Sequence, residues 1–176
     1  MFVKLIRTIT PIQEVKLDKN VLIIGLAEAN VKRIAVALAE KLNRMYMDVD
    51  ELIEYQLVNK QGLKKVGREY FEKIQKGCIR QACDCVNTVV TISTDLYLFA
   101  DYAEILSKFY VIFVNFTKND YLFAIESCPK ERQLELKNRV VVFDELNAQL
   151  RKRANLCINY STDDNVVDKI LIKLCK

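Results

Sequence analysis

The chain has 176 residues, of which 51% are hydrophobic and 28% charged, and its net charge is +4. This is enough chain for one domain with its own hydrophobic core. No apolar run approaches the roughly 20 residues that span a bilayer, and the mild, scattered positive charge is unlike that of a nucleic-acid-binding domain. We therefore expect a cytoplasmic protein with neither a membrane nor a nucleic-acid partner.

The His and Cys content restricts the chemistry further. The sequence has no His and six Cys, and the closest thiol pair, Cys83 and Cys85, forms a C-x-C rather than a C-x-x-C. Because no His can complete a mixed zinc site, we expect free thiols and no metal cluster. Without His, acid–base chemistry would fall to Asp, Glu or Lys.

The first part of the chain predicts a strand–loop–helix–strand unit. Residues 1–20 alternate loosely between apolar and polar, and they form an N-terminal extension that allows an extra strand. The apolar run 21–24 predicts a buried strand that ends at Gly25. Residues 33–43 carry apolar side chains on one helical face. Residues 45–49 predict a second strand, which ends at the acidic pair Asp48 and Asp50.

The rest of the chain continues to alternate between strands and helices. The pattern predicts further strands at 87–92, 109–116 and 155–160, and helices at 50–58, 64–84, 96–108, 144–153 and at the C-terminus, where Ser161 or Thr162 could cap the helix. Five apolar strands that alternate with helices predict a three-layer α/β/α fold, with a five-stranded parallel sheet flanked by helices. We expect residues 21–176 to form one domain.

The loop after the first strand lacks the residues that bind phosphate. Strand, loop, helix and a second strand tipped with carboxylates open many phosphate-binding α/β domains. A phosphate-binding loop of this kind reads G-x-x-x-x-G-K-[ST]. Counted from Gly25, the last three required positions hold Asn30, Val31 and Lys32, and Glu28 adds a negative charge where a phosphate would lie. The sequence predicts the scaffold of such a site without its chemistry.

The order of these segments resembles the shikimate kinase family of P-loop proteins related to nucleoside monophosphate kinases. Three stretches carry the resemblance: LIIGLAEANVKRIAVALAEKLNRMYMDVDELIE at 22–54, GREYFEKIQ at 67–75 and RANLCINYSTDDNVVDKILIKL at 153–174. The resemblance implies a P-loop kinase fold, Mg-ATP as cofactor and shikimate as phosphoryl acceptor. It also implies a reduced lid, because the chain passes almost directly from Arg139 and three valines into the helix at 144–153.

The resemblance assigns roles to three residues. Asp48 would help to hold magnesium, Asp50 would bind shikimate hydroxyls, and Arg139 would be the remnant of a catalytic lid arginine. Asp48 and Asp50 have an alternative interpretation, as a solvated strand end and a cap for the helix that starts at Glu51. Neither interpretation is excluded by the sequence.

Other family positions depart from the pattern. Glu72 stands where the family has the arginine that grips the shikimate carboxylate, and residues 91–95 stand where it has three glycines. Lys32 or Arg33 could replace the missing loop lysine only after a loop shift, since successive helical side chains point about 100° apart. These losses favour a catalytically inactive pseudokinase that has no cofactor and binds an unknown protein partner or small molecule.

Two alternatives stay open. The first is an active shikimate kinase that uses Mg-ATP through a remodelled loop, with Lys32, Asp48, Asp50 and Arg139 at work. The second is a structural or interaction module on a P-loop fold. The apolar run 140–143 would then be a docking patch, or else part of the core. The sequence leaves the oligomeric state open.

Overall fold

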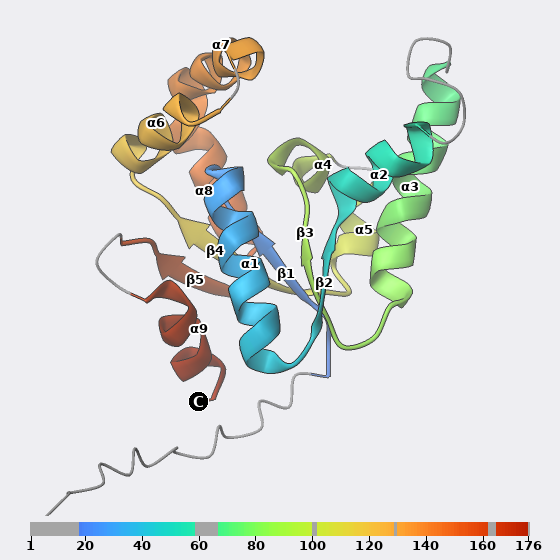
Figure 1. The fold of residues 1–176 in the computed structure, drawn as a ribbon, viewed down its shortest axis with the longest axis horizontal. Helices are drawn as coiled ribbons and strands as arrows, with labels where there is room; N and C mark the ends of the chain where they lie inside the picture. Colours follow the sequence, from blue (N-terminus) through green and yellow to red (C-terminus); the bar gives the residue numbers. More distant parts are fainter. Residues whose placement is uncertain (1–17, 59–66, 100–101, 129, 162–164, 176) are drawn as a thin grey trace, which may run out of the picture.

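A five-stranded, all-parallel sheet forms the centre of the molecule (Figure 1). The computed structural model describes residues 18–58, 67–99, 102–128, 130–161 and 165–175, so most of the predicted N-terminal extension lies outside the described residues. The strand order is β2-β3-β1-β4-β5. The strands are β1 (Val21–Ile24), β2 (Met45–Asp48), β3 (Thr88–Thr91), β4 (Tyr110–Asn115) and β5 (Leu156–Asn159). The predicted fold class is confirmed.

The apolar runs of the sequence lie in the middle of this sheet. Every residue of β1 and β3 is buried, whereas β2, at one edge, starts at an exposed Met45. A strand covered by helices on both faces needs a continuous apolar sequence rather than an alternating one. In register, Val21 pairs with Val89 of β3 and with Tyr110 of β4, so the chain segment after β1 lies at the centre of the carboxyl edge.

Helices flank the sheet, and two helical pairs stand on opposite sides of its carboxyl edge (Figure 1). One pair is α2 with α3, and the other is α6 with α7. The helices are α1 (Glu28–Leu42), α2 (Val49–Val58), α3 (Arg68–Asp84), α4 (Thr94–Leu98), α5 (Ala103–Leu106), α6 (Lys118–Glu126), α7 (Lys130–Asn138), the 3-10 helix η3 (Arg139–Val142), α8 (Phe143–Arg153) and α9 (Val166–Leu174). No helix within the described ranges is long and apolar enough to cross a bilayer.

The structure corrects two local predictions. The helix predicted at 96–108 is two short helices, because Phe99 takes extended angles (φ −63°, ψ 123°) after α4. The phenol of the buried Tyr97 donates to the Arg153 carbonyl at 3.2 Å and anchors α4 against α8. The last helix is capped by Asn165, whose side chain accepts the Asp168 N–H at 3.3 Å, and not by Ser161; Thr162 lies outside the described residues.

Candidate functional site

The connection between β1 and α1 is short and buried. Gly25, Leu26 and Ala27 join the strand to a helix that starts at Glu28, and Leu26 and Ala27 are only 5% and 2% exposed. A Cβ on Gly25 would lie 2.7 Å from the Val114 carbonyl oxygen and 3.0 Å from a Val31 methyl carbon. The segment therefore packs as core.

Three backbone N–H groups of this segment bond to carbonyls within it. Glu28 donates to the Leu26 carbonyl at 3.1 Å, while Asn30 and Val31 both donate to the Ala27 carbonyl, at 2.9 and 3.0 Å. A phosphate-binding loop works because its N–H groups converge on the anion. Here the N–H groups at the second-glycine and lysine positions of the motif close the first turn of a helix instead.

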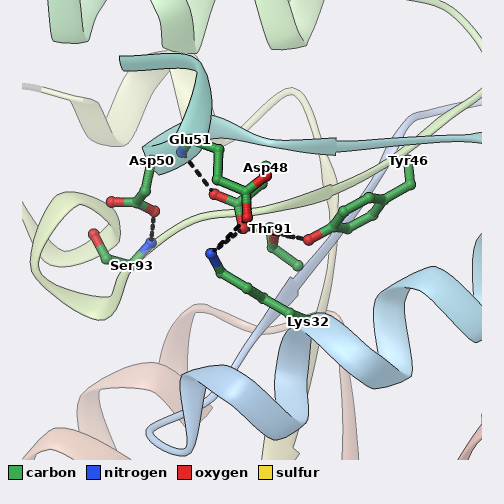
Figure 2. A network of polar contacts seen from close by, with 7 residues as sticks. All are labelled: Lys32, Tyr46, Asp48, Asp50, Glu51, Thr91 and Ser93. Carbon is green, nitrogen blue, oxygen red and sulfur yellow. Dashed lines mark hydrogen bonds and ion pairs between the residues drawn. The ribbon is translucent and has the colours of Figure 1, made fainter. Parts of the chain in front are cut away.

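Lys32 turns away from this connection toward the end of β2 (Figure 2). Its ammonium lies 2.7 Å from Asp48 Oδ2 and 3.2 Å from Glu51 Oε1. Burial alone would lower the pKa of Lys32, but its hydrogen bonds and charge interactions with Asp48 and Glu51 outweigh burial and raise this pKa above its ordinary value. Lys32 is therefore a charged group that is already paired.

Asp48 is almost completely buried and its oxygens are engaged. Its side chain is 1% exposed. Besides Lys32, it accepts the Thr91 hydroxyl at 3.0 Å, the Tyr46 hydroxyl at 3.3 Å and the Glu51 N–H at 3.0 Å (Figure 2). The alternative that Asp48 is a solvated carboxylate is thus wrong. The Glu51 N–H at the start of α2 goes to Asp48, and not to Asp50.

Asp50 points to the neighbouring strand connection. It accepts the Ser93 N–H at 2.6 Å (Figure 2). Burial raises the pKa of Asp50 above its ordinary value, although the hydrogen bonds from Ser93 and the charge of Lys32 work in the opposite direction. Ser93 lies in the stretch that replaces the three glycines of the family pattern. Its backbone N–H holds the Asp50 carboxylate in place.

A cavity of 610 Å³ joins these residues at the carboxyl edge of β1, β2 and β3. Among the described residues, its lining has five acidic side chains and one basic side chain, Lys32. The acidic residues are Glu28, Asp48, Asp50, Glu51 and Glu54, and the uncharged ones are Gly25, Val31, Thr91, Ile92 and Ser93. A wall with this charge balance repels phosphates and carboxylates rather than binding them. The structure thus brings Gly25, Val31, Lys32, Asp48 and Asp50 together, as the sequence predicts.

Arg139 lies beside this cavity and is held by two carboxylates. Its guanidinium bonds Asp95 Oδ2 at 2.6 Å and lies 3.9 Å from Glu28 Oε1, and its side chain is 18% exposed. The partners come from α4 and from the first residue of α1. Asn30, also predicted here, accepts from Arg33 at 2.7 Å instead of lining the cavity.

Sequence reasoning missed two members of this network, Tyr46 and Thr91. The structure also shows where Glu72 and the run 140–143 lie. Thr91 lies opposite Asp48 through the β2–β3 pairing, a long-range register that the sequence does not display. Tyr46 lies two residues before Asp48 on β2, a spacing that places both side chains on one face of the strand and that the sequence does show. Glu72 pairs with Arg68 at 2.8 Å on α3, apart from the cavity lining. In the run 140–143, Val141 is 88% exposed, whereas Phe143 is buried, so the run is divided between surface and core, and a docking patch there stays a prediction. The described residues contain no cluster of three metal-ligating side chains.

Comparisons with known proteins agree with this architecture. A family model described as shikimate kinase matches residues 32–175, which is most of the chain. The shikimate kinase of Bacteroides thetaiotaomicron superposes with a TM-score of 0.70 at 16% identity, over 89% of this chain and 96% of that chain. The shikimate kinase of Aquifex aeolicus superposes with a TM-score of 0.66 at 18% identity, over 88% of this chain and 95% of that chain.

The shikimate kinase of Acinetobacter baumannii, solved in complex with shikimate, gives a TM-score of 0.65 at 17% identity, over 89% of this chain and 90% of that chain. No curated protein sequence matches the chain significantly. Structural likeness at these identities shows the fold alone, whereas the family match includes Lys32, Asp48, Asp50, Arg139 and the strands β2 to β5, and begins after β1 and the connection at 25–31. The chain belongs to the shikimate kinase family.

Proposed function

We propose that this protein is a member of the shikimate kinase family that has lost ATP-dependent phosphoryl transfer and acts as a pseudokinase, through binding or regulation. One observation carries the proposal: the N–H groups of Glu28, Asn30 and Val31 all bond to carbonyls of the same short segment. Phosphoryl transfer depends on donors and cations that hold the transferring group in place. Without a cradle for the phosphates, the positioning that drives the reaction is lost.

The residues present do not fit Mg-ATP. The cradle position is filled by Val31, which packs against Gly25, and by the carboxylate of Glu28. Lys32, at the position of the magnesium-binding hydroxyl, places its ammonium 2.7 Å from Asp48 Oδ2, where it neutralises the carboxylate that would otherwise face a metal ion. These contacts support an internal ion pair in place of a metal–nucleotide complex.

The charge of the cavity also opposes shikimate. Glu72 stands at the family position of the carboxylate-binding arginine and pairs with Arg68. Arg139 is engaged with Asp95. A negatively charged acid entering the cavity would meet the carboxylates of its lining, and the lysine there, Lys32, is already paired with Asp48 and Glu51. We therefore infer that the role of this protein does not depend on turnover of shikimate.

A phosphoryl-transfer assay tests the proposal. Purified protein is incubated with γ-labelled Mg-ATP and shikimate, and the shikimate kinase of Aquifex aeolicus serves as the positive control. We expect no transfer above the rate without protein. Transfer that scales with protein concentration, and that is lost on Lys32→Ala, would overturn the proposal in favour of a kinase with a remodelled loop.

A second variant tests whether the side chains of this segment or its backbone conformation block the reaction. The triple substitution Asn30→Gly, Val31→Lys and Lys32→Ser rewrites the segment from Gly25 as a complete G-x-x-x-x-G-K-S motif. Because Leu26 and Ala27 are buried and the helix starts at Glu28, we expect this variant to remain inactive. Recovered activity would mean that the backbone can open into a loop and that the side chains alone block the reaction.

A further inference from the structure

We propose that a second cavity, at the amino ends of β4 and β5, binds a small amphipathic carboxylic acid, whose carboxylate is held by the Arg153 guanidinium. This amino-edge cavity has a volume of 410 Å³, and its described lining has no residue in common with that of the cavity at the carboxyl edge. The inference concerns a separate site, so it stands whether or not the protein transfers phosphate.

The floor of the amino-edge cavity is apolar and buried. It contains Tyr97 of α4, Leu106 of α5, Phe109 and Val111 of β4, which are 3%, 4%, 3% and 4% exposed. The part of the lining that the structure describes contains no carboxylate. A cavity of this size lies in the range that holds small-molecule ligands. Its floor therefore suits a ring or a short hydrocarbon chain.

A cation lies at the rim of this floor. Arg153, the last residue of α8, lines the cavity, and its Nη1 donates to the Tyr97 carbonyl at 3.2 Å. The Tyr97 phenol donates in return to the Arg153 carbonyl at 3.2 Å. These two bonds fix the arginine but use one of its five N–H donors.

The remaining donors of Arg153 are available to a ligand. Within the described ranges, no carboxylate forms an ion pair with this guanidinium. The guanidinium donors form a planar fork that matches the two oxygens of a carboxylate. An apolar acid that lies on the cavity floor could thus place its carboxylate against Arg153.

Asn155 adds an amide to the same rim. Its Oδ1 accepts the Val111 N–H at 2.8 Å, which orients the side chain so that its NH2 group points away from this bond. Arg151 and Lys152, in the same last turn of α8 as Arg153, are exposed and add positive charge nearby. Polar donors beside an apolar floor favour a ligand with one anionic end and an apolar body.

Calorimetric titration at pH 7 with 3-phenylpropionate tests the proposal, because this probe has a ring, a short chain and one carboxylate. Its amide, 3-phenylpropanamide, has nearly the same shape without the charge and is the control ligand. We expect one molecule of the acid to bind per chain. The amide should bind about tenfold more weakly, the factor that loss of one charge-assisted hydrogen bond produces.

Three variants identify the site. Arg153→Gln should weaken binding of the acid about tenfold and leave binding of the amide unchanged. Retained amide binding also shows that the cavity keeps its shape without the bond to Tyr97. Arg151→Gln, in the same helical turn but outside the described lining, is the matched control and should weaken the acid by about twofold or less. Ala103→Phe, at an exposed position of the lining, should block both ligands by filling the cavity.

Four results would overturn the proposal. Absence of saturable binding of the acid up to millimolar concentration would mean that the cavity holds no such ligand. Equal weakening by Arg153→Gln and Arg151→Gln would mean that surface charge alone attracts the acid. Binding that survives Ala103→Phe would place the acid elsewhere. Inorganic phosphate that displaces the acid at equal concentration would show that the apolar floor has no part in binding. Each result is independent of the phosphoryl-transfer assay, so this proposal and the proposed function fail separately.

Discussion

At the scale of single residues, Lys32 and Asp48 form the central interaction of the site. The Asp48 side chain is 1% exposed and forms an ion pair with Lys32, whose side chain is 39% exposed. A buried carboxylate is costly unless it is paired and hydrogen-bonded. Lys32 thus stabilises the negative charge of the buried Asp48.

Removal of the ammonium should destabilise the protein. We expect Lys32→Met to lower the free energy of unfolding by about 1–3 kcal/mol, less than for a fully buried pair because part of the lysine is in solvent. Glu51→Gln is the control: its side chain is 66% exposed, and we expect a loss of less than about 1 kcal/mol. Urea unfolding measures both. Equal losses of unfolding free energy in the two variants would show that the contact of Lys32 with Asp48 contributes no more to stability than its contact with Glu51.

Asp50 gives a prediction about pH. Because burial raises the pKa of Asp50 in the folded protein, the folded state holds this proton more tightly than the unfolded state. The ionised carboxylate therefore costs stability above the folded pKa, and the cost disappears as the pH falls toward the unfolded value. Asn at this position can still accept the Ser93 N–H.

We accordingly expect Asp50→Asn to be more stable than the parent protein at pH 7, with a difference that shrinks toward pH 4. Thermal unfolding as a function of pH measures this difference. A variant that is less stable than the parent at pH 7 would show that the negative charge of Asp50 stabilises the site, through Ser93 and Lys32, by more than its burial costs.

At the scale of elements, the start of α1 decides what the site can do. Ala27 provides no side-chain cap, yet the helix starts at Glu28, whose acidic side chain suits the positive end of the helix dipole. Leu26 and Ala27 are buried, and Val31 packs on Gly25. Apolar burial and an early helix start therefore take the place of an open loop.

Gly25 should tolerate no side chain. We expect Gly25→Ala to destabilise the protein by about 1–3 kcal/mol or more, because the new methyl group would lie 2.7 Å from the Val114 carbonyl oxygen. Gly77→Ala is the matched control: nothing lies within 4 Å of a Cβ there, and inside α3 the change should stabilise by about 0.5–1 kcal/mol. Urea unfolding compares them. A neutral Gly25→Ala would contradict the tight packing of this segment.

At the scale of the whole molecule, the fold could be predicted because short, local sequence patterns identify its strands. The run at 21–24 is continuous and apolar, and the run at 88–91 is continuously β-branched; both sequences suit strands of a parallel sheet covered on both faces. The approach of Lys32 to Asp48 could not be predicted, because it depends on how α1 turns over β2. Likewise, the partners of Arg139 lie 44 residues away at Asp95 and at the distant Glu28.

The predicted helix at 96–108 failed for a related reason. Its apolar spacing is helical, but the chain is broken after α4, where Tyr97 is held by Arg153 and Tyr102 donates to Gln75 at 3.1 Å. These are contacts between segments far apart in the sequence, and they override the local preference. The prediction that Asp50 caps the helix after β2 failed for a different reason. The Glu51 N–H goes to Asp48, three residues earlier, which is the ordinary local spacing of a helix cap.

The most direct test of the central claim, that the phosphate cradle is closed, is a calorimetric titration of the protein with Mg-ATP. Because the N–H groups of Glu28, Asn30 and Val31 bond to carbonyls of the same segment and Lys32 is paired with Asp48, we predict no saturable heat up to millimolar nucleotide. Saturable binding of one Mg-ATP per chain, weakened by Lys32→Ala, would contradict the claim and show that the segment opens into a working loop.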